Sequence, residues 1–83
     1  MSAVGFIKKI AAIAGAIDRA DRAWVSSITL VRLVDGEYTY TATCTGHGEP
    51  REFPSYEEAS DWVARLRDLS RAEAVLRELE ALA

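Results

Sequence analysis

Residues 24–53, WVSSITLVRLVDGEYTYTATCTGHGEPREF, decide the fold of this 83-residue chain. Asp35-Gly36 lies between two strand-like runs, and this pair tolerates the positive φ that tight hairpin turns need. After the turn, from Tyr38 to Thr45, tyrosine, alanine and cysteine alternate with threonine. Period-2 alternation places Tyr, Ala and Cys on one face, the tyrosine face, and the threonines on the other, the threonine face. The stretch therefore predicts a β-hairpin followed by a short third strand.

The first strand of the hairpin is less regular, because apolar residues occupy both of its faces. A two-residue loop would place Val31 opposite Tyr40, whereas a three-residue loop with left-handed Gly36 would place Leu30 there. A slip of one residue exchanges the faces, and both registers remain open. Apolar side chains of this strand fall on the threonine face in either register, so that face is covered by a helix or is a contact surface. One face of this strand carries Ile28, Leu30 and Val34 together with the charged Arg32, and the other face carries Val31 and Leu33.

The composition predicts one small globular domain spanning residues 1–83, with 49% hydrophobic and 28% charged residues. The net charge of −3 argues against a general nucleic-acid binder, which usually presents a basic face. Residues 1–34 carry five basic and two acidic side chains, whereas residues 35–83 carry five basic and eleven acidic ones. The acidic second half is interpreted as solvated helix surface, with a basic partner as the alternative.

The cysteine and histidine content and the hydropathy of the chain limit which disulfides, metal sites and membrane spans it could form. Cys44 is the only cysteine, so no internal disulfide can form, which fits the reducing cytoplasm of a bacterial host. Its position on the tyrosine face predicts a buried structural thiol. A zinc site around His47, the only histidine, would need carboxylate help, so neither a metal nor a cofactor is expected. No apolar run approaches the roughly 20 residues of a membrane span, and no signal-peptide pattern is present.

Residues 3–22 are predicted to form an amphipathic helix that packs in the core. The Phe-Ile-Lys-Lys-Ile-Ala sequence also resembles short membrane-active peptides, so association with a membrane surface is an alternative. Ala12 and Ala16 lie away from the apolar stripe, which consists of Phe6, Ile10, Ile13 and Ile17, widened by Ile7 and Ala14.

After the hairpin, turn-forming residues predict a loop over residues 46–50. Residues 51–53 then form a short third strand, which Pro54 stops and confines to an edge of the sheet. The sequence from Ser55 to Glu58 fits a capping box at the start of a helix.

That C-terminal helical region contains Trp62, the expected core anchor. A second capping box from Ser70 to Glu73 predicts a break near Leu69-Ser70. The expected architecture is α+β, a small antiparallel three-stranded sheet flanked by an N-terminal helix and two C-terminal helices, in the order α-β-β-β-α-α.

No catalytic constellation is recognisable, and the chain is expected not to be an enzyme. The single histidine and the single cysteine have no third group that would orient the histidine. Neither a Walker loop nor a dinucleotide-binding motif is present. The element order also occurs in double-stranded RNA-binding domains, which grip phosphates with basic residues. Glu57 and Glu58 open the corresponding helix here and would repel phosphate.

From Ile28 onward the chain resembles the small phage-encoded anti-CRISPR inhibitors of type I systems. The resemblance rests on element order, on Val34-Asp35-Gly36 at the turn, on residues 51–55 at the strand exit and on residues 57–62 in the helix. The N-terminal helical segment departs from it, because the relative begins with a strand. The resemblance implies an inhibitor without a cofactor that blocks a CRISPR surveillance complex where target DNA or the nuclease docks.

The expected partner is therefore a protein or ribonucleoprotein complex, and direct nucleic-acid binding is not expected. Self-association as a homodimer through the apolar residues of the first strand is the alternative to the inhibitor. The predicted partner-binding residues lie on or beside the threonine face and the adjacent loop, and they are Arg32, Glu37, Thr39, Thr41, His47 and Arg51.

Overall fold

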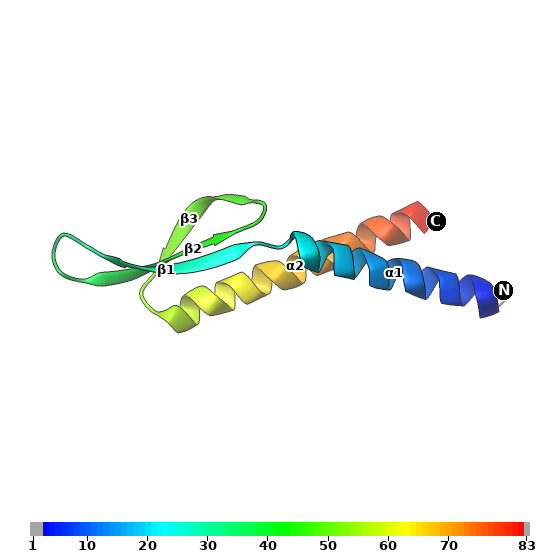
Figure 1. Cartoon of the computed structure of the whole chain (residues 1–83), viewed down its shortest axis with the longest axis horizontal. Helices are drawn as coiled ribbons and strands as arrows, with labels where there is room; N and C mark the ends of the chain where they lie inside the picture. The colour runs from blue at the N-terminus through cyan, green and yellow to red at the C-terminus, as the bar shows by residue number, and fades with distance from the viewer. Residues whose placement is uncertain (1–2, 83) are drawn as a thin grey trace. The chain divides into compact units, whose positions relative to one another are not determined.

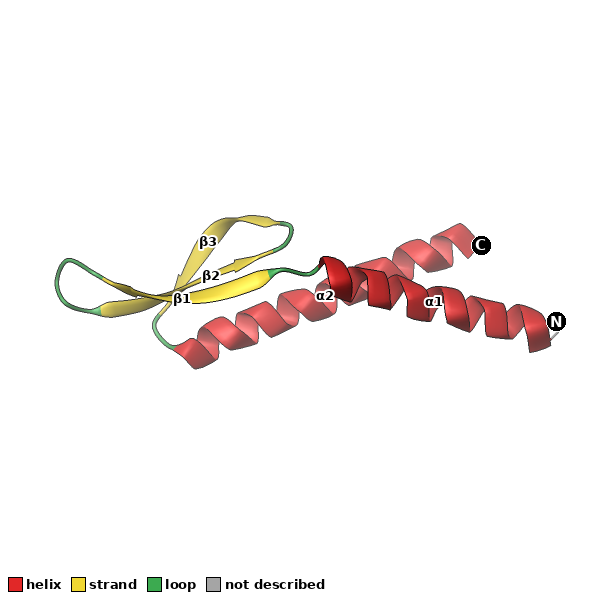
Figure 2. Ribbon diagram, viewed as in Figure 1, coloured by secondary structure: helices red, strands yellow, loops and turns green. Residues whose placement is uncertain are grey.

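The computed structural model describes residues 3–82 (Figure 1). The chain forms an α+β fold with an antiparallel three-stranded sheet, an N-terminal helix and a C-terminal helix, as predicted (Figure 2). It divides into two compact units, the helical unit (residues 3–23 and 68–82) and the sheet unit (Trp24–Arg67). The elements in chain order are α1 (Ala3–Ala23), β1 (Ser26–Arg32), β2 (Tyr38–Cys44), β3 (His47–Phe53) and α2 (Tyr56–Leu82).

The C-terminal region is one helix, so the predicted break near Leu69-Ser70 is wrong. The beginning of α2 is as predicted, since the Glu58 amide donates a hydrogen bond to Ser55 Oγ at 3.2 Å. At Ser70 the same residue pattern does not end the helix, because no glycine or proline occurs between residues 56 and 82. Serine inside a helix costs only a few tenths of a kcal/mol relative to alanine, and the alanine-rich sequence around it favours continuation.

The hairpin of β1 and β2 adopts the register of the three-residue loop. Gly36 has φ of 89°, and its amide donates to the Leu33 carbonyl at 3.0 Å. The Leu33 amide donates to the Glu37 carbonyl at 2.7 Å, and Asp35 Oδ1 accepts from the Glu37 amide at 3.0 Å. A carboxylate that binds a nearby backbone amide and a glycine that accepts positive φ together select this turn. Leu30 consequently lies opposite Tyr40, and Ile28 opposite Ala42.

The third strand begins at His47, so the predicted loop over residues 46–50 is wrong beyond Gly46. A tight turn at Thr45-Gly46, with φ of 84° at Gly46, leads directly into β3. The pairing with β2 shifts between Ala42 and Cys44, and this irregularity accommodates Pro50 inside the strand. The edge position of β3 and its end directly before Pro54 are confirmed.

The core of the sheet unit lies between the tyrosine face and the first turns of α2. Ala42 and Ala59 are fully buried, and Cys44 is buried beside them. Tyr40 and Tyr56 meet edge to face with ring centroids 6.0 Å apart. The prediction that the tyrosine face contributes the core is confirmed for Ala42 and Cys44, whereas Tyr38, near the hairpin tip, is exposed.

In the helical unit, α1 runs as predicted, but only the second half of its predicted apolar stripe is partly buried. Ala16, which that stripe excludes, is its buried residue, whereas Phe6, at 58%, and Ile7, at 63%, are exposed, as is Ile10. Ile13 and Ile17 are partly buried. The expectation that Phe6, Ile7 and Ile10 pack in the core is therefore wrong.

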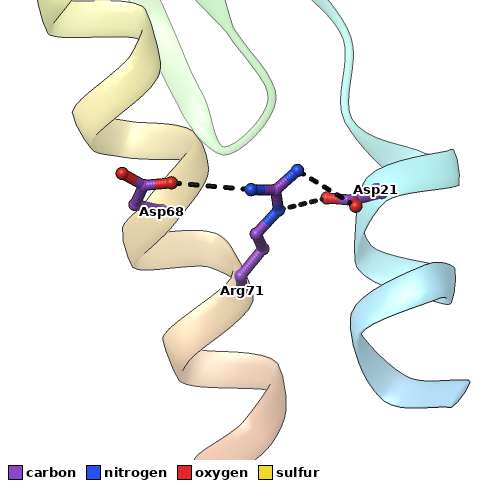
Figure 3. A network of polar contacts seen from close by, with 3 residues as sticks. All are labelled: Asp21, Asp68 and Arg71. Atoms are coloured by element: carbon purple, nitrogen blue, oxygen red, sulfur yellow. Dashed lines mark hydrogen bonds and ion pairs between the residues drawn. The ribbon is translucent and has the colours of Figure 1, made fainter. Parts of the chain in front are cut away.

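A polar network joins the two helices of this unit (Figure 3). Arg71 Nε donates to Asp21 Oδ1 at 2.7 Å, and Arg71 Nη2 donates to Oδ2 at 3.2 Å, which forms a bidentate pair. Arg71 also faces Asp68 at 3.6 Å, one turn earlier on α2. The hydrogen bond with Asp21 raises the pKa of Arg71 above its ordinary value, so the guanidinium stays charged at every working pH.

Candidate functional site

β1 is an edge strand with one open side, because within residues 3–82 its strand neighbour is β2. The Val25 carbonyl accepts from the Thr45 amide, and the Leu33 amide donates to the Glu37 carbonyl, so odd-numbered residues face β2. Bonded and non-bonded pairs alternate along an antiparallel ladder. The backbone N–H and C=O groups of Ile28 and Leu30 therefore point away from the sheet and are available to a further strand.

The side chains along this open edge are mainly apolar. Val25 is 70% exposed and Leu30 is 53% exposed. Leu30 lies on the tyrosine face, whereas Val31 and Leu33 lie on the threonine face, so both faces of the strand present apolar surface. The other exposed apolar residues of this strand and its turn are Val31, Leu33 and Val34.

β1 also lacks the features that usually protect an edge strand. Its sequence, SSITLVR, contains no glycine, no proline and no acidic residue, and Arg32 is its only charge. Natural edges commonly carry charges, proline or a bulge that prevents pairing with another chain. β1 is therefore an unguarded template for strand addition.

β3, the opposite edge, has the protection that β1 lacks. Its sequence, HGEPREF, contains Pro50, and acidic Glu49 and Glu52 alternate with basic Arg51 near it. The register shift opposite residues 42–44 interrupts the regular ladder of β3. A partner strand would meet a missing amide and an irregular backbone there, so the two edges of the sheet are not equivalent.

An aromatic and cationic cluster fixes β3 against α2. The Trp62 ring lies 5.5 Å from the Phe53 ring and 6.0 Å from His47, centroid to centroid. The Arg51 guanidinium carbon lies 5.5 Å from the Phe53 ring and 5.8 Å from the Trp62 ring, which is cation–π distance. Trp62 is thus a core anchor, although it is partly exposed.

The six residues predicted to bind a partner do not form one surface. His47 and Arg51 pair opposite Cys44 and Ala42, so they lie on the tyrosine face around Trp62 and not beside the threonines. The other four belong to the β1–β2 hairpin and its turn, and they are Arg32 opposite Tyr38, Glu37 in the turn, and Thr39 and Thr41 on the threonine face.

Among these four, Thr39 is buried at 8% exposure. Its hydroxyl donates to the Phe53 carbonyl at 3.2 Å, so it joins β2 to the end of β3. Arg32 and Glu37 are exposed, and Thr41 is partly exposed opposite Thr29.

The residues predicted to bind a partner did not include Val25, which is 70% exposed, or Leu30, which is 53% exposed. Leu30 entered the sequence-based predictions only as one of the apolar residues of the alternative homodimer surface. The signal that could have identified them was present. Apolar residues of both parities in a strand without charges indicate that one face alone cannot bury them, and an open edge follows when the strand is terminal in the sheet.

Cys44 is the buried thiol that its position on the tyrosine face predicted. Burial raises the pKa of this thiol above its ordinary value of 9.0. The thiol is therefore protonated at neutral pH, and the reactive thiolate is disfavoured.

Within residues 3–82, no three His, Cys, Asp or Glu side chains are grouped so that they could hold a metal ion. None of the helices described in this range is both long enough and apolar enough to cross a bilayer.

The chain matches no known protein family, no curated protein and no solved structure. Its function is therefore inferred from its own residues.

Proposed function

We propose that the chain is a non-enzymatic protein-binding inhibitor that docks through the open edge of β1. The observation that supports this proposal is the unguarded, largely apolar edge from Ser26 to Arg32. The proposed target is a type I CRISPR surveillance complex, which the resemblance of residues 28–83 to anti-CRISPR proteins implies. Occupation of the surface where target DNA or the nuclease docks would block the complex without any chemical step.

Strand addition explains how a strand of seven residues binds a protein. An extended segment of the target pairs with the outward amides and carbonyls of the even-numbered residues, while side chains on both faces contact neighbouring pockets. Each backbone hydrogen bond contributes about 0.5–1.5 kcal/mol net. Burial of exposed apolar atoms adds about 25 cal/mol per Å². The residues that supply the outward groups are Ser26, Ile28, Leu30 and Arg32.

Charged residues at the hairpin tip set the orientation of the docked segment. Arg32 and Glu37 carry opposite charges close to the turn and are both exposed. Opposite charges at the rim of an interface favour one partner register and speed association more than they raise affinity. His47 and Arg51 form a second, weaker contact patch at the opposite edge of the sheet, on β3.

The test is binding of the full chain to immobilised type I surveillance complexes, measured by biolayer interferometry. Leu30→Pro removes an outward amide and leaves the pairing with β2 intact, and we expect at least a tenfold loss of affinity. Leu30→Ala is the matched control, because it truncates the same side chain and keeps the amide. Circular dichroism of both variants checks that the fold is retained.

Two outcomes would overturn different parts of this proposal. If the native chain binds no type I complex at micromolar concentration, the proposed target is wrong. If Leu30→Pro and Leu30→Ala bind the complex equally well, the proposed target still holds, but the proposal that the chain docks through the β1 edge is wrong.

A further inference from the structure

Each helix of the helical unit carries a second apolar stripe on the side opposite its partly buried face. In residues 68–82 of α2 the partly buried residues are Ser70, Arg71, Ala74, Val75 and Glu78, whereas Leu76 is 59% exposed. The outer stripe has the 3-4-3 spacing of a coiled-coil seam and consists of Leu69, Ala72, Leu76 and Leu79, all exposed.

α1 repeats this arrangement. Its buried residue is Ala16, and the apolar residues on the opposite side of the helix are exposed. The outer stripe of α1 also has 3-4-3 spacing and consists of Val4, Ile7, Ala11 and Ala14. A helix that is apolar on two sides requires a neighbour on each of them, and the structure supplies a neighbour for one.

An apolar groove between the two helices adjoins the α2 stripe. It has a volume of about 360 Å³, and Lys9 is the only charged residue among those that line it. Leu79 belongs both to the groove and to the α2 stripe, so the groove and this stripe adjoin, and we call the two together the open face. The apolar residues that line the groove are Phe6, Ile10, Ile13, Leu79 and Leu82.

The open face exposes several large apolar side chains in a chain of 9.1 kDa, each between 38% and 59% exposed. Exposed apolar side chains that gather in one patch mark an interaction surface more often than single ones do. The residues are Phe6, Ile10, Leu69, Leu76, Leu79 and Leu82.

The charges beside the open face identify its occupant. Residues 3–17 of α1 carry Lys8 and Lys9 and no acidic residue, which gives +2. Residues 72–82 of α2 carry three glutamates and Arg77, and Glu78 pairs with Arg19 of the same chain at 3.7 Å. Glu73 and Glu80 remain beside Arg77, which gives −1. A two-fold interface brings the same patch of both copies together, so the basic helix of one copy meets the acidic helix of the other. An anionic bilayer would attract α1 and repel α2.

We infer that the open face binds a second copy of this chain, so that two helical units form an antiparallel four-helix bundle. The heptad-like spacing of the α2 stripe suits a helical occupant, and Ala72 within it allows the facing helix to approach closely. The bundle is formed by residues of the helical unit and uses none of β1, so this dimer does not depend on the proposed inhibitor function.

Sedimentation velocity of the full chain tests this inference. We expect the native chain to sediment as a dimer of twice 9.1 kDa at micromolar concentration. Leu76→Glu places a charge in the open face and should raise the dissociation constant at least tenfold. Arg77→Glu, next to it on the charged side of α2, is the matched control and should change the dissociation constant less. Because Leu76 is exposed, the helicity of the variant monomer should equal that of the native chain.

A charge exchange tests the orientation of the two copies independently of folding. Lys8→Glu with Lys9→Glu should weaken the dimer, and adding Glu73→Lys with Glu80→Lys should restore it. A strict monomer at hundreds of micromolar would overturn the inference, as would a dimer that Leu30→Pro abolishes and Leu76→Glu does not. Monomers that co-sediment with phosphatidylglycerol vesicles in an Ile7-dependent manner would replace the second copy with a lipid surface.

Discussion

β1 and β3 occupy equivalent positions in one sheet and differ in almost everything else. Both are seven residues long, and both pair with β2. β3 contains Pro50 and alternating charges, and Trp62 packs against its Phe53. β1 has neither feature, and Leu30 and Val31 expose apolar atoms on its two faces.

The difference shows that an edge is protected by its own residues and not by its place in the sheet. β3 carries residues that prevent pairing with another strand, and Trp62 of α2 packs against it. β1 is held in the sheet unit by its pairing with β2 and by the hairpin turn. A strand that is weakly fixed and unguarded is suited to a partner, because binding supplies the second neighbour that it lacks. Four substitutions test how far this difference extends.

The largest effect is expected from Trp62→Ala, which removes the clamp on β3. A fully buried tryptophan costs roughly 3–5 kcal/mol on truncation. Trp62 is partly exposed, so we expect the free energy of unfolding to fall by about 2–3 kcal/mol. Urea unfolding measures this loss, and hydrogen exchange should show that β3 amides lose more protection than β1 amides. Equal loss in both strands would contradict the asymmetry between the edges.

A smaller effect is expected at the two turns. Gly36 and Gly46 both have positive φ, and a Cβ at either position would meet nothing within 4 Å. Alanine at either position therefore costs only the left-handed backbone penalty of about 1–2 kcal/mol. Urea unfolding should give similar losses for the two variants.

Hydrogen exchange separates these two variants. Gly36→Ala should lower the protection of β1 amides throughout the strand, because the turn and the β2 ladder are its only supports in the sheet unit. Gly46→Ala should affect β3 less, since the Trp62 cluster still holds that strand. The reverse order would show that the cluster contributes little to fixing β3.

The smallest effect concerns pH and Cys44, at the end of β2 opposite His47. Burial raises the pKa of the folded thiol above its ordinary 9.0. Well below pH 9 the thiol is protonated in both the folded and the unfolded state and contributes no pH dependence. As the pH approaches and passes 9, the unfolded thiol ionises first, so the free energy of unfolding should fall as pH rises. Native and Cys44→Ala chains compared in urea between pH 7 and pH 10 measure the difference, which the variant should lack.

The rate at which Cys44 is alkylated gives a second measure of how well the fold protects this thiol. Iodoacetamide should modify Cys44 in the folded chain much more slowly than in urea, because the thiolate is the nucleophile. Fast alkylation of the folded chain would show that the β2–β3 end opens readily and that β3 is not the more firmly held edge.

Much of this fold followed from local residue patterns. Asp35-Gly36 predicted the hairpin, Ser55 and Glu58 predicted the beginning of α2, and Pro54 predicted the end of β3. These signals act over two or three residues, through backbone geometry and through short side chains that accept hydrogen bonds from nearby amides. The register of the hairpin stayed open, since both loop lengths satisfy the sequence, and the turn hydrogen bonds at Leu33 and Glu37 decide it.

The parts that could not be predicted depend on contacts between distant residues. Gly48 and Pro50 favour a loop locally, and pairing with β2 includes them in a strand nonetheless. Ser70 resembles a helix start, but its neighbours continue α2. The apolar stripe of α1 suggested a core face, whereas α1 packs through Ala16 and leaves Phe6 exposed. For the candidate site, the residue types of His47 and Arg51 were evident, but their packing around Trp62 requires the fold.

The ion pair of Asp21 and Arg71 has a consequence for the order of folding. Its partners are 50 positions apart in the sequence, whereas the paired residues of the sheet are close neighbours along the chain. Loop closure over short separations loses less entropy and occurs faster. We therefore expect the sheet unit to form first and to shorten the effective loop between the two helices. The helical unit, which contains the open face, should then be completed last.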